Sequence, residues 1–313
     1  MTKVFIDGRA GTTGLQIQGR MELRDDVALL SLPEQLKKDP AARKAVINEA
    51  DFVFLCLPDA AAKEAAAMVE NSRTRIIDAS TAHRTDPAWA YGFPELSPAH
   101  RSAIEAAQFV ANPGCHATGF IALVYPLVQL GLLSPDYPLC AHSLTGYTGG
   151  GKNMIQQYES PDRDPEYDAP RHYSLNLSHK HIPEIMQVCG LQAQPIFCPI
   201  VCDFPQGMLV TVPLHLNLLG NAPSLAQLQT AYRDFYAGQK NICVAPVMGG
   251  DLIRDGFLGS NNVVGTNRLN IFVCGNDHQA IVSAQFDNLG KGASGAAVQN
   301  LNIMMGVDEN LSL

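Results

Sequence analysis

The sequence has few charged residues, a single tryptophan and no long apolar run. Only 17% of its 313 residues are charged and 46% are hydrophobic, a balance that supplies a large core and excludes a disordered chain. No stretch of about 18 apolar residues is available for a membrane span, and the first residues lead into a predicted strand rather than a leader peptide. We therefore expect a soluble, cytoplasmic protein with no membrane partner, built as two domains or one large α/β unit.

Positive charge is also scarce. The chain has 22 Lys and Arg against 30 Asp and Glu, which gives a formal net charge of -8. No basic run or basic stripe with interleaved aromatic residues occurs, and such a stripe is the usual footprint of phosphate-backbone binding. The composition argues against a nucleic-acid partner and leaves a small-molecule substrate as the expectation.

The eight cysteines lack the spacing of a disulfide framework or a zinc site. Cys198 and Cys202 lie four residues apart, but the residues between them are predicted to form a strand, and no second pair follows at finger spacing. Buried, reduced thiols in a reducing compartment are therefore expected, with no bound metal. The cysteines are Cys56, Cys115, Cys140, Cys189, Cys198, Cys202, Cys243 and Cys274.

A glycine-rich loop follows the first predicted strand. Residues 3–7 are apolar, residues 8–14 form the loop, and residues 15–21 have helical periodicity. Glycines let backbone N–H groups approach a pyrophosphate at a helix N-terminus, although a tight strand-to-helix turn needs the same pattern. The predicted cofactor-binding residues of the loop are Gly8, Arg9, Gly11, Thr12, Thr13 and Gly14.

Strands and helices then alternate. Further strands are predicted at residues 27–32, 51–58 and 75–80, with helices at 40–50 and 60–69. This βαβαβαβ order is typical of a doubly wound parallel sheet, so the first hundred residues predict a Rossmann-type dinucleotide-binding domain of the α/β class. Pro58, at the end of the third strand, is counted among the cofactor-binding residues.

The residues at the end of the second predicted strand indicate whether NAD or NADP binds. An acidic residue there would accept the ribose 2′-hydroxyl of NAD, but the strand ends Leu30-Ser31-Leu32-Pro33 without a carboxylate. Ser31 as a donor and Arg9 in the first loop favour a 2′-phosphate and hence NADP. Glu34, two residues beyond Leu32, is the main argument against NADP.

The segment Asn112-Pro113-Gly114-Cys115 has a catalytic pattern. A strand at residues 109–111 stops at this turn, and Cys115 begins a helix that runs to about residue 130. The helix dipole and free backbone N–H groups lower a thiol pKa and stabilise an oxyanion at an attached carbonyl. Cys115 is therefore the predicted nucleophile, and the alternative is a cysteine that only happens to begin a helix.

Together with Ala117-Thr118-Gly119, this segment resembles the active site of the N-acetyl-gamma-glutamyl-phosphate reductase family, in a group that includes aspartate-semialdehyde dehydrogenase. The resemblance covers nearly the whole chain, whose compact length is similar to that of the shorter subgroup. His116, where many members carry an aromatic residue, and the loop Gly149-Gly150-Gly151-Lys152 depart from the family pattern. Other landmarks, in family order, are residues 8–14, 77–80 with Arg84, 91–95, 146–152, 179–184, 259–261 and 287–292.

The resemblance implies an NADP-dependent enzyme of arginine biosynthesis. It would reduce N-acetyl-L-glutamyl 5-phosphate to N-acetyl-L-glutamate 5-semialdehyde through a thioester at Cys115. A related aspartate-semialdehyde or phosphorylating aldehyde dehydrogenase is one alternative. A non-catalytic dinucleotide-binding regulator is another, although it would need neither a cysteine at a helix start nor a pair of histidines.

His179 and His181 are separated by one residue just before Pro183-Glu184, and the resemblance places the acid–base group in this motif. We favour His181 as the catalytic base over His179 because it is nearer the helix whose first turn Pro183 suits. His116 is a third candidate, although neighbouring residues on a helix face apart.

Three residues are predicted to bind the substrate. Arg84 follows the fourth strand at its carboxyl end, where ligands of open α/β sheets bind, and Asn112 lies beside the nucleophile. Lys152 ends a stretch, residues 146–152, that is predicted to be a flexible loop suited to a phosphate or carboxylate. A solvated loop charge is the alternative for Lys152. Asn288 is assigned to cofactor binding.

Beyond residue 139 the pattern changes to longer strands. They are predicted at 139–146, 194–202, 208–216, 270–275 and 279–287, the last two as an antiparallel hairpin, with helices at 182–188 and 224–236. The sequence thus predicts an NADP-binding domain of residues 1–114 and 288–313 and an α+β domain of the semialdehyde dehydrogenase type, residues 115–287, with a mostly antiparallel or mixed sheet. By resemblance, the last helix returns to the first domain beside the nicotinamide, and the second domain forms a homodimer or homotetramer.

Overall fold

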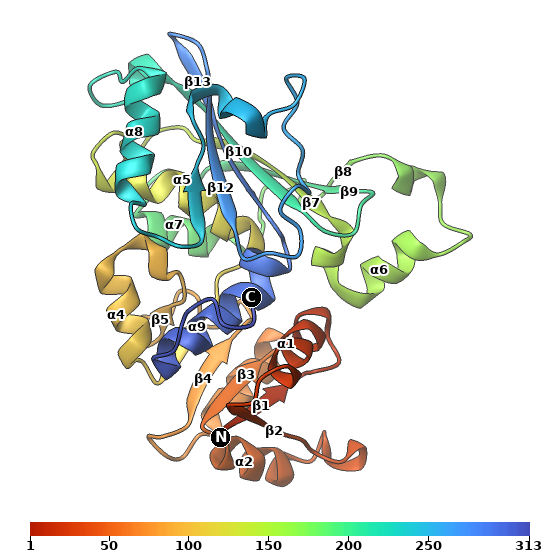
Figure 1. The fold of residues 1–313 in the computed structure, drawn as a ribbon. Helices are drawn as coiled ribbons and strands as arrows, with labels where there is room; N and C mark the ends of the chain where they lie inside the picture. Colours follow the sequence, from red (N-terminus) through yellow and green to blue (C-terminus); the bar gives the residue numbers. More distant parts are fainter. The chain divides into compact units, whose positions relative to one another are not determined.

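The computed structural model describes residues 1–313, which divide into two units (Figure 1). Unit 1 contains Met1–Gly114 and Ala293–Leu313, and unit 2 contains Cys115–Gly292. The second junction therefore lies between Gly292 and Ala293, five residues beyond the expected 287/288 boundary. The assignment of a separate role to each unit stays a prediction.

Unit 1 is an open parallel sheet covered by helices on both faces. Its strand order is β2-β1-β3-β4-β6-β5, and every neighbouring pair is parallel. The strands are β1 (Thr2–Asp7), β2 (Val27–Leu30), β3 (Phe52–Leu55), β4 (Arg75–Asp78), β5 (Ala90–Tyr91) and β6 (Phe109–Ala111); the helices are α1 (Thr12–Glu22), α2 (Pro40–Glu49), α3 (Asp59–Ala67), α4 (Pro98–Ala106) and α9 (Gly295–Met305).

Both faces of this sheet are buried, which explains the near-continuous apolar runs of its strands. Val4 and Ile6 of β1 pack in one cluster with α1, α4 and α9, whereas Phe5 packs in a second cluster with α2 and α3. The strand order changes direction at β1, where α/β sheets bind ligands beyond the carboxyl ends of their strands.

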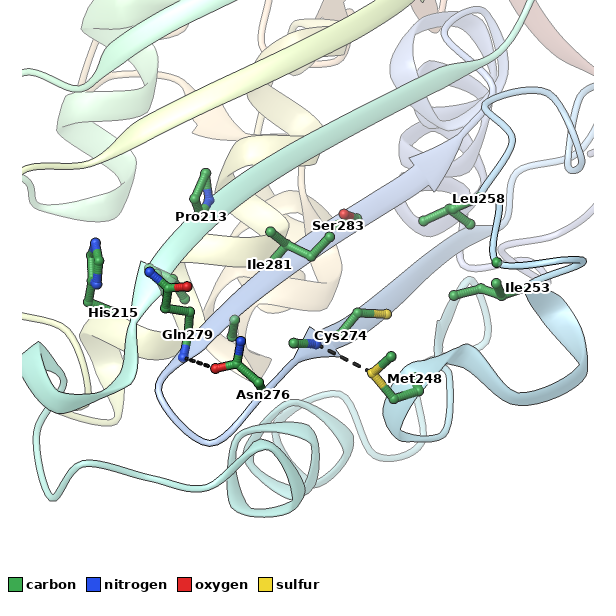
Figure 2. Close-up of a pocket in the computed structure, with 14 residues that line it drawn as sticks. Pro213, His215, Met248, Ile253, Leu258, Cys274, Asn276, Gln279, Ile281 and Ser283 are labelled. Carbon is green, nitrogen blue, oxygen red and sulfur yellow. Dashed lines mark hydrogen bonds between the residues drawn. The ribbon is translucent and has the colours of Figure 1, made fainter.

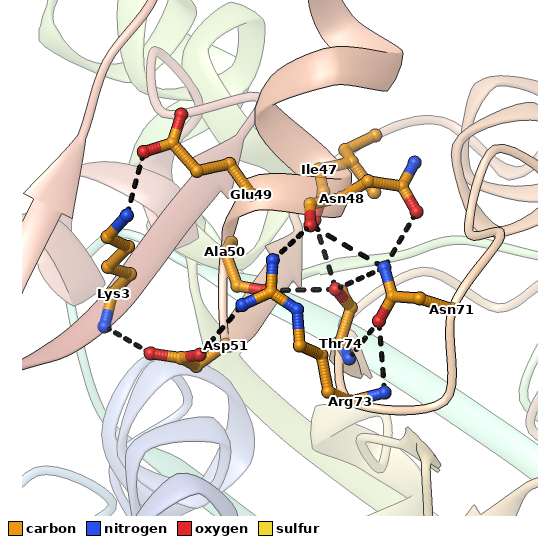
Figure 3. Close-up of polar contacts among 9 residues, drawn as sticks. All are labelled: Lys3, Ile47, Asn48, Glu49, Ala50, Asp51, Asn71, Arg73 and Thr74. Atoms are coloured by element: carbon orange, nitrogen blue, oxygen red, sulfur yellow. Dashed lines mark hydrogen bonds and ion pairs between the residues drawn. The ribbon is translucent and has the colours of Figure 1, made fainter.

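A polar network ties the opposite, amino-terminal edge of the sheet (Figure 3). Thr74 is fully buried before β4, and its hydroxyl donates to the carbonyl of Ala50 at 2.9 Å. The Asn71 amide donates to the Asn48 side chain at 2.9 Å, and the backbone N–H of Lys3 donates to Asp51 at 2.9 Å. These bonds satisfy polar groups around the carboxyl end of α2 and the starts of β1, β3 and β4.

Unit 2 is built on a seven-stranded mixed sheet of order β11-β12-β13-β10-β7-β9-β8. Four of the six neighbouring pairs are antiparallel and two, β11·β12 and β7·β9, are parallel. The strands are β7 (Cys140–Gly146), β8 (Arg171–His172), β9 (Ile196–Cys202), β10 (Met208–His215), β11 (Ile242–Val244), β12 (Leu269–Gly275) and β13 (Gln279–Phe286); the helices are α5 (Cys115–Gln129), α6 (Gly151–Glu159), α7 (Ile182–Cys189) and α8 (Leu225–Phe235).

Helices α5 and α8 pack on one face of this sheet. Two tyrosines of unit 2 bond to α5: the hydroxyl of Tyr232, in α8, donates to the carbonyl of Leu123 at 2.6 Å, and that of Tyr236, just after α8, donates to that of Ala122 at 2.8 Å. The mixed sheet and the β12–β13 hairpin confirm the predicted fold class. No helix has both the length and the apolar character needed to cross a membrane.

The other sheet face carries an apolar cavity of about 630 Å³ (Figure 2). Its walls come from β10, β12, β13 and the η6 turn (Val247–Leu252), and they include Ile281, which is 46% exposed, and Met248, which is 53% exposed. Phe257, close by in sequence to the lining residues Gly256 and Leu258, is 79% exposed. This part of the sheet is therefore apolar and open.

One local expectation was wrong. Residues 146–152 are not one flexible loop: β7 ends at Gly146, a 3₁₀ turn spans Tyr147–Gly150, and α6 begins at Gly151. The backbone N–H of Gly146 donates to Gly207, and the Thr148 hydroxyl donates to Pro205, which holds the turn in place. The last helix, α9, follows a π-helical turn, Gly290–Ser294.

Candidate active site

Cys115 is the first residue of α5 and is partly exposed. The chain reaches it from β6 through the buried turn of residues 112–114, because Pro113 cannot continue the parallel ladder. The N–H groups of a first helical turn have no partner within the helix. A thiolate or a carbonyl oxygen at Cys115 therefore lies where these N–H groups and the helix dipole stabilise negative charge.

In unit 1, Arg84 and Asn112 form hydrogen bonds around the turn that precedes Cys115. Arg84 is buried and donates to the carbonyl of Asn112 at 2.9 Å and to that of Ala79 at 3.0 Å. The Asn112 side chain donates to the carbonyl of Ala293 at 3.0 Å and accepts from Asn300 at 3.1 Å. Two of the three predicted substrate-binding residues, Arg84 and Asn112, thus shape the backbone that leads into α5.

Three imidazoles gather in unit 2 around the start of α5. The ring of His116 lies 5.2 Å from that of His179 and 5.6 Å from that of His181, and the latter two rings are 4.8 Å apart. His181 is buried and caps α7, a helix that packs against α5. The structure therefore brings the His-x-His segment to the residue that follows Cys115. We call His116, His179 and His181 the imidazole cluster.

Burial lowers the pKa of two members of the imidazole cluster, His116 and His179. Burial, assisted by the charges of His179 and Lys180, lowers the pKa of His116 well below its usual range. Burial, followed by Lys180, lowers the pKa of His179 to about 4. Moreover, the backbone N–H of His181 donates to Nδ1 of His179 at 3.2 Å, which leaves Nε2 as the protonated nitrogen of that ring.

Tyr173 and Ser143 belong to the same site, and sequence reasoning missed both. The Tyr173 hydroxyl lies 2.6 Å from Nε2 of His116, and the Ser143 hydroxyl lies 2.6 Å from Nδ1. Burial, with a smaller effect from Cys115, raises the pKa of Tyr173, so its hydroxyl stays protonated. Neither residue lies in a recognisable motif, and no local signal in the sequence pointed to them.

The glycine loop of unit 1 has the geometry of a dinucleotide site. Gly8 has φ +86°, and a Cβ there would lie 2.2 Å from the Cys56 carbonyl oxygen; a Cβ at Gly14 would lie 2.8 Å from the Gly8 carbonyl oxygen. Gly11 caps α1, and the hydroxyl of Thr12 is buried without a hydrogen-bond partner. An unpaired donor beside free helical N–H groups fits a pyrophosphate.

A cavity of about 350 Å³ opens beside this loop. Gly8, Arg9, Ser31 and Leu57 line it, together with Lys37, which sequence reasoning did not single out. The Lys37 ammonium pairs with the Glu34 carboxylate, and this contact, with a smaller effect from Arg9, lowers the pKa of Glu34. Ser31, directly after β2, therefore shares this cavity with the cationic side chains of Arg9, after β1, and Lys37.

The other predicted site residues have these positions. Thr13 lies in the first turn of α1, and Pro58 caps α3 at the end of β3. Lys152 is exposed in the first turn of α6. The buried amide of Asn288 donates to Thr148 at 3.1 Å and accepts the N–H of Gly207 at 2.8 Å, so both ends of this side chain are engaged within unit 2.

Family models match both parts of the chain. Residues 6–104 match the semialdehyde dehydrogenase NAD binding domain, and residues 115–288 match the semialdehyde dehydrogenase dimerisation domain. Aspartate semialdehyde dehydrogenase from Francisella tularensis has a similar fold, with TM-score 0.72 at 13% identity over 97% of this chain and 100% of that one. The enzyme II from Vibrio cholerae, solved with ASA, gives TM-score 0.72 at 13% identity over 98% of both chains. Fold and site define an oxidoreductase of the semialdehyde dehydrogenase class that binds a nicotinamide dinucleotide.

Sequence relatives narrow this class. N-acetyl-gamma-glutamyl-phosphate reductase 2 of Nostoc sp. is 49% identical over 99% of both chains, and that of Pseudomonas putida is 46% identical over 97% of this chain and 96% of the other. The chain belongs to the N-acetyl-gamma-glutamyl-phosphate reductase family, as the sequence resemblance predicted.

Proposed function

We propose that the protein reduces N-acetyl-L-glutamyl 5-phosphate to N-acetyl-L-glutamate 5-semialdehyde with NADPH, a step of arginine biosynthesis. The relatives named N-acetyl-gamma-glutamyl-phosphate reductase are similar over nearly the full chain length, which supports this choice of substrate. The observation that carries the chemistry is Cys115 at the start of α5, next to His116 of the imidazole cluster. A dinucleotide-binding regulator would need neither feature.

Cys115 acts as the nucleophile. Its thiolate attacks the acyl carbonyl and expels phosphate, so that a thioester joins the acyl group to the enzyme. When bound, the reduced nicotinamide supplies a hydride to the thioester carbonyl. Hydrogen bonds from the first turn of α5 stabilise the oxyanion that results, and its collapse releases the semialdehyde and regenerates the thiolate.

We infer that His181 moves the protons. A base with pKa about 4, as in His179, is too weak to take a thiol proton efficiently at neutral pH and is not protonated there. His116 is also held neutral, with hydroxyls at both ring nitrogens. His181 is the remaining imidazole, and it lies at the α7 terminus that packs beside α5. It would accept the thiol proton and return it to the departing groups.

Arg84, Asn112 and Lys152 stay the proposed substrate-binding residues, and Asn288 with the 8–14 loop and Pro58 the proposed cofactor-binding ones. Lys152 carries an exposed cation, suited to the phosphate or carboxylate of the substrate. Arg84 and Asn112 already bond to the backbone before Cys115, so they would act on the substrate mainly by fixing that turn.

NADP is the proposed dinucleotide. Ser31 and the cations of Arg9 and Lys37 line the cavity at the end of β2, where a 2′-phosphate would lie. Glu34, the argument against NADP, is paired with Lys37 and sits on an exposed turn. Its carboxylate is therefore partly neutralised in place.

The open face of the unit 2 sheet is the proposed subunit interface. Ile281, Met248 and Phe257 expose apolar surface there, and the family model that matches this unit is described as a dimerisation domain. A homodimer or homotetramer would cover them. We also propose a cytoplasmic location, which the eight free thiols support.

Replacement of Cys115 with Ser tests the chemistry. The near-isosteric hydroxyl should leave cofactor binding intact, yet phosphate-dependent oxidation of N-acetyl-glutamate 5-semialdehyde should be lost because an alkoxide is inaccessible near neutral pH. Substantial retained turnover would rule out the nucleophile. A panel of acyl phosphates, including aspartyl phosphate, tests the substrate: faster turnover of another acyl group would favour the alternative dehydrogenase.

A further inference from the structure

His116 connects three separate parts of unit 2. It is 3% exposed in the first turn of α5, and its two ring nitrogens lie 2.6 Å from the hydroxyls of Ser143, in β7, and Tyr173, just after β8. A neutral imidazole has one donor and one acceptor. Since burial keeps the ring neutral, one hydroxyl donates to it and the other accepts from it. Both nitrogens are thus used, and the ring plane is fixed.

The segment of residues 173–181, which contains Tyr173 and the His-x-His pair, is an irregular stretch between β8 and α7. Ser174 and Leu177 have positive φ values of 53° and 55°, and Leu175 is 77% exposed. Hydrogen bonds from the Tyr173 N–H to the Pro199 carbonyl and from the Gln194 side chain to the Leu177 carbonyl join it to neighbouring segments. An irregular segment of this kind needs side-chain contacts to hold a catalytic group in place.

The ring of His116 supplies such contacts. It packs edge-on against His179 at 5.2 Å and tilted against His181 at 5.6 Å, while its Nε2 bonds to Tyr173 at the start of the segment. Phe197, 5.5 Å from His116 and 5.3 Å from His179, closes the other side. The segment is therefore held at both ends by the residue adjacent to Cys115.

We propose that His116 is a positioning residue: with Ser143 and Tyr173 it holds the 173–181 segment against the start of α5 and so places His181 at the Cys115 thiol. The inference rests on the proposed function, because it assigns His116 a part in the same thiol chemistry. His116 transfers no proton itself. Its role is geometric, and the hydrogen bond to Tyr173 is its key contact.

The test uses four variants of the full chain: His116→Phe, Tyr173→Phe, the double variant and the control Tyr232→Phe. The control removes an equally short, 2.6 Å hydrogen bond, from α8 to α5. His116→Phe and Tyr173→Phe should each lower kcat about tenfold with KM within about twofold, since each loses one hydrogen bond that orients the base. The kcat of the double variant should equal that of the less active single variant, because both changes break the same hydrogen bond.

A second readout does not depend on the substrate. The rate at which iodoacetamide alkylates Cys115 should fall about tenfold in both single variants, because the thiol loses its oriented base. Tyr232→Phe should lower Tm but leave kcat and the alkylation rate unchanged. His116→Gln, which keeps a donor and an acceptor, should retain most of the activity and serves if His116→Phe does not fold.

Several outcomes would overturn the positioning role: unchanged kcat and alkylation in His116→Phe and Tyr173→Phe, an effect on KM alone, or additive losses in the double variant. A further result distinguishes failure of the proposed substrate from failure of the positioning role of His116. If no acyl phosphate of the expected class is turned over but Cys115 alkylation still falls in these variants, the proposed substrate is wrong and the role of His116 stands.

Discussion

At the scale of single residues, surroundings give three histidines different chemistry. His116 is held by hydroxyls on both nitrogens, His179 accepts a backbone N–H, and His181 caps a helix. Burial lowers the pKa values of the first two, so that neither ring is positively charged at neutral pH. A shared residue type therefore says little about which imidazole transfers protons.

His181→Asn should reduce turnover about 100-fold or more and leave the dissociation constant for NADPH unchanged, as is usual for loss of a general acid–base group. His179→Asn should do less, since the pKa of His179, about 4, keeps this ring neutral throughout the neutral pH range. Steady-state kinetics between pH 5 and 9 measures both effects. In His181→Asn the limb that reports an imidazole should disappear.

A stronger loss in His179→Asn than in His181→Asn would reverse the assignment within the pair and leave the mechanism in place. If neither variant is impaired, the His-x-His segment is structural, and the start of α5 alone sustains the thiolate.

At the scale of elements, β1, the glycine loop, α1 and the end of β2 line one cavity, which is the proposed cofactor site. Its glycines determine how close the backbone comes to the pyrophosphate, and its side chains at the end of β2 determine which ribose is accepted. Selectivity and affinity should therefore respond to different substitutions.

NADPH should bind more tightly than NADH, as measured by fluorescence titration of each reduced cofactor. Ser31→Asp should reverse this order, because a carboxylate repels the 2′-phosphate and accepts the 2′-hydroxyl; a combined change in the ratio of dissociation constants of about tenfold or more is expected. Gln18→Ala, which alters an uncharged residue of the same cavity, is the control and should change both affinities alike. Tighter NADH binding by the unaltered protein would contradict the NADP assignment.

Elements with a strong local pattern could be predicted from the sequence. The strands of unit 1 are apolar runs because both faces are covered, and Cys115 and the His-x-His pair lie in short local motifs. By contrast, α6 was missed because three glycines stand at its start, and the two-residue β8 exists only through its pairing with β9. Local sequence carries no record of such contacts.

The same limit applies to the site. Tyr173 and His116 are 57 residues apart in the chain, and only the β7–β9 part of the sheet and the packing of α7 on α5 bring their segments together. Lys37 reaches the cofactor cavity through the η1 turn (Glu34–Leu36), which has no distinctive pattern. Residues that are brought to a site by long-range contacts could therefore be identified only in the structure.

At the scale of the whole molecule, the open sheet face of unit 2 is the proposed subunit interface. Ile281→Arg places a charge in its centre, beside the cavity formed by β10, β12 and β13 (Figure 2). A desolvated, unpaired cation at an interface is costly, so the variant should show a smaller mass than the unaltered protein in light scattering coupled to size-exclusion chromatography.

Leu130→Arg is the matched control for Ile281→Arg, since Leu130 is 48% exposed near the end of α5, away from that sheet face. It should leave the mass unchanged. An Ile281→Arg protein of unaltered mass, or a mass change in both variants, would place the interface elsewhere.

The discontinuity of unit 1 has a consequence for biosynthesis. Ala293–Leu313, which contains α9, leaves the ribosome only after all of unit 2, although α9 packs against α1, α4 and β4. Its core residues Val298 and Leu301 fill the same cluster as Val4. During translation the nascent parallel sheet must wait with one face incompletely covered, while unit 2, a continuous stretch of chain, can complete its own core first. The cofactor-binding half is then the later of the two to mature, and chaperones would meet it in its partly exposed form.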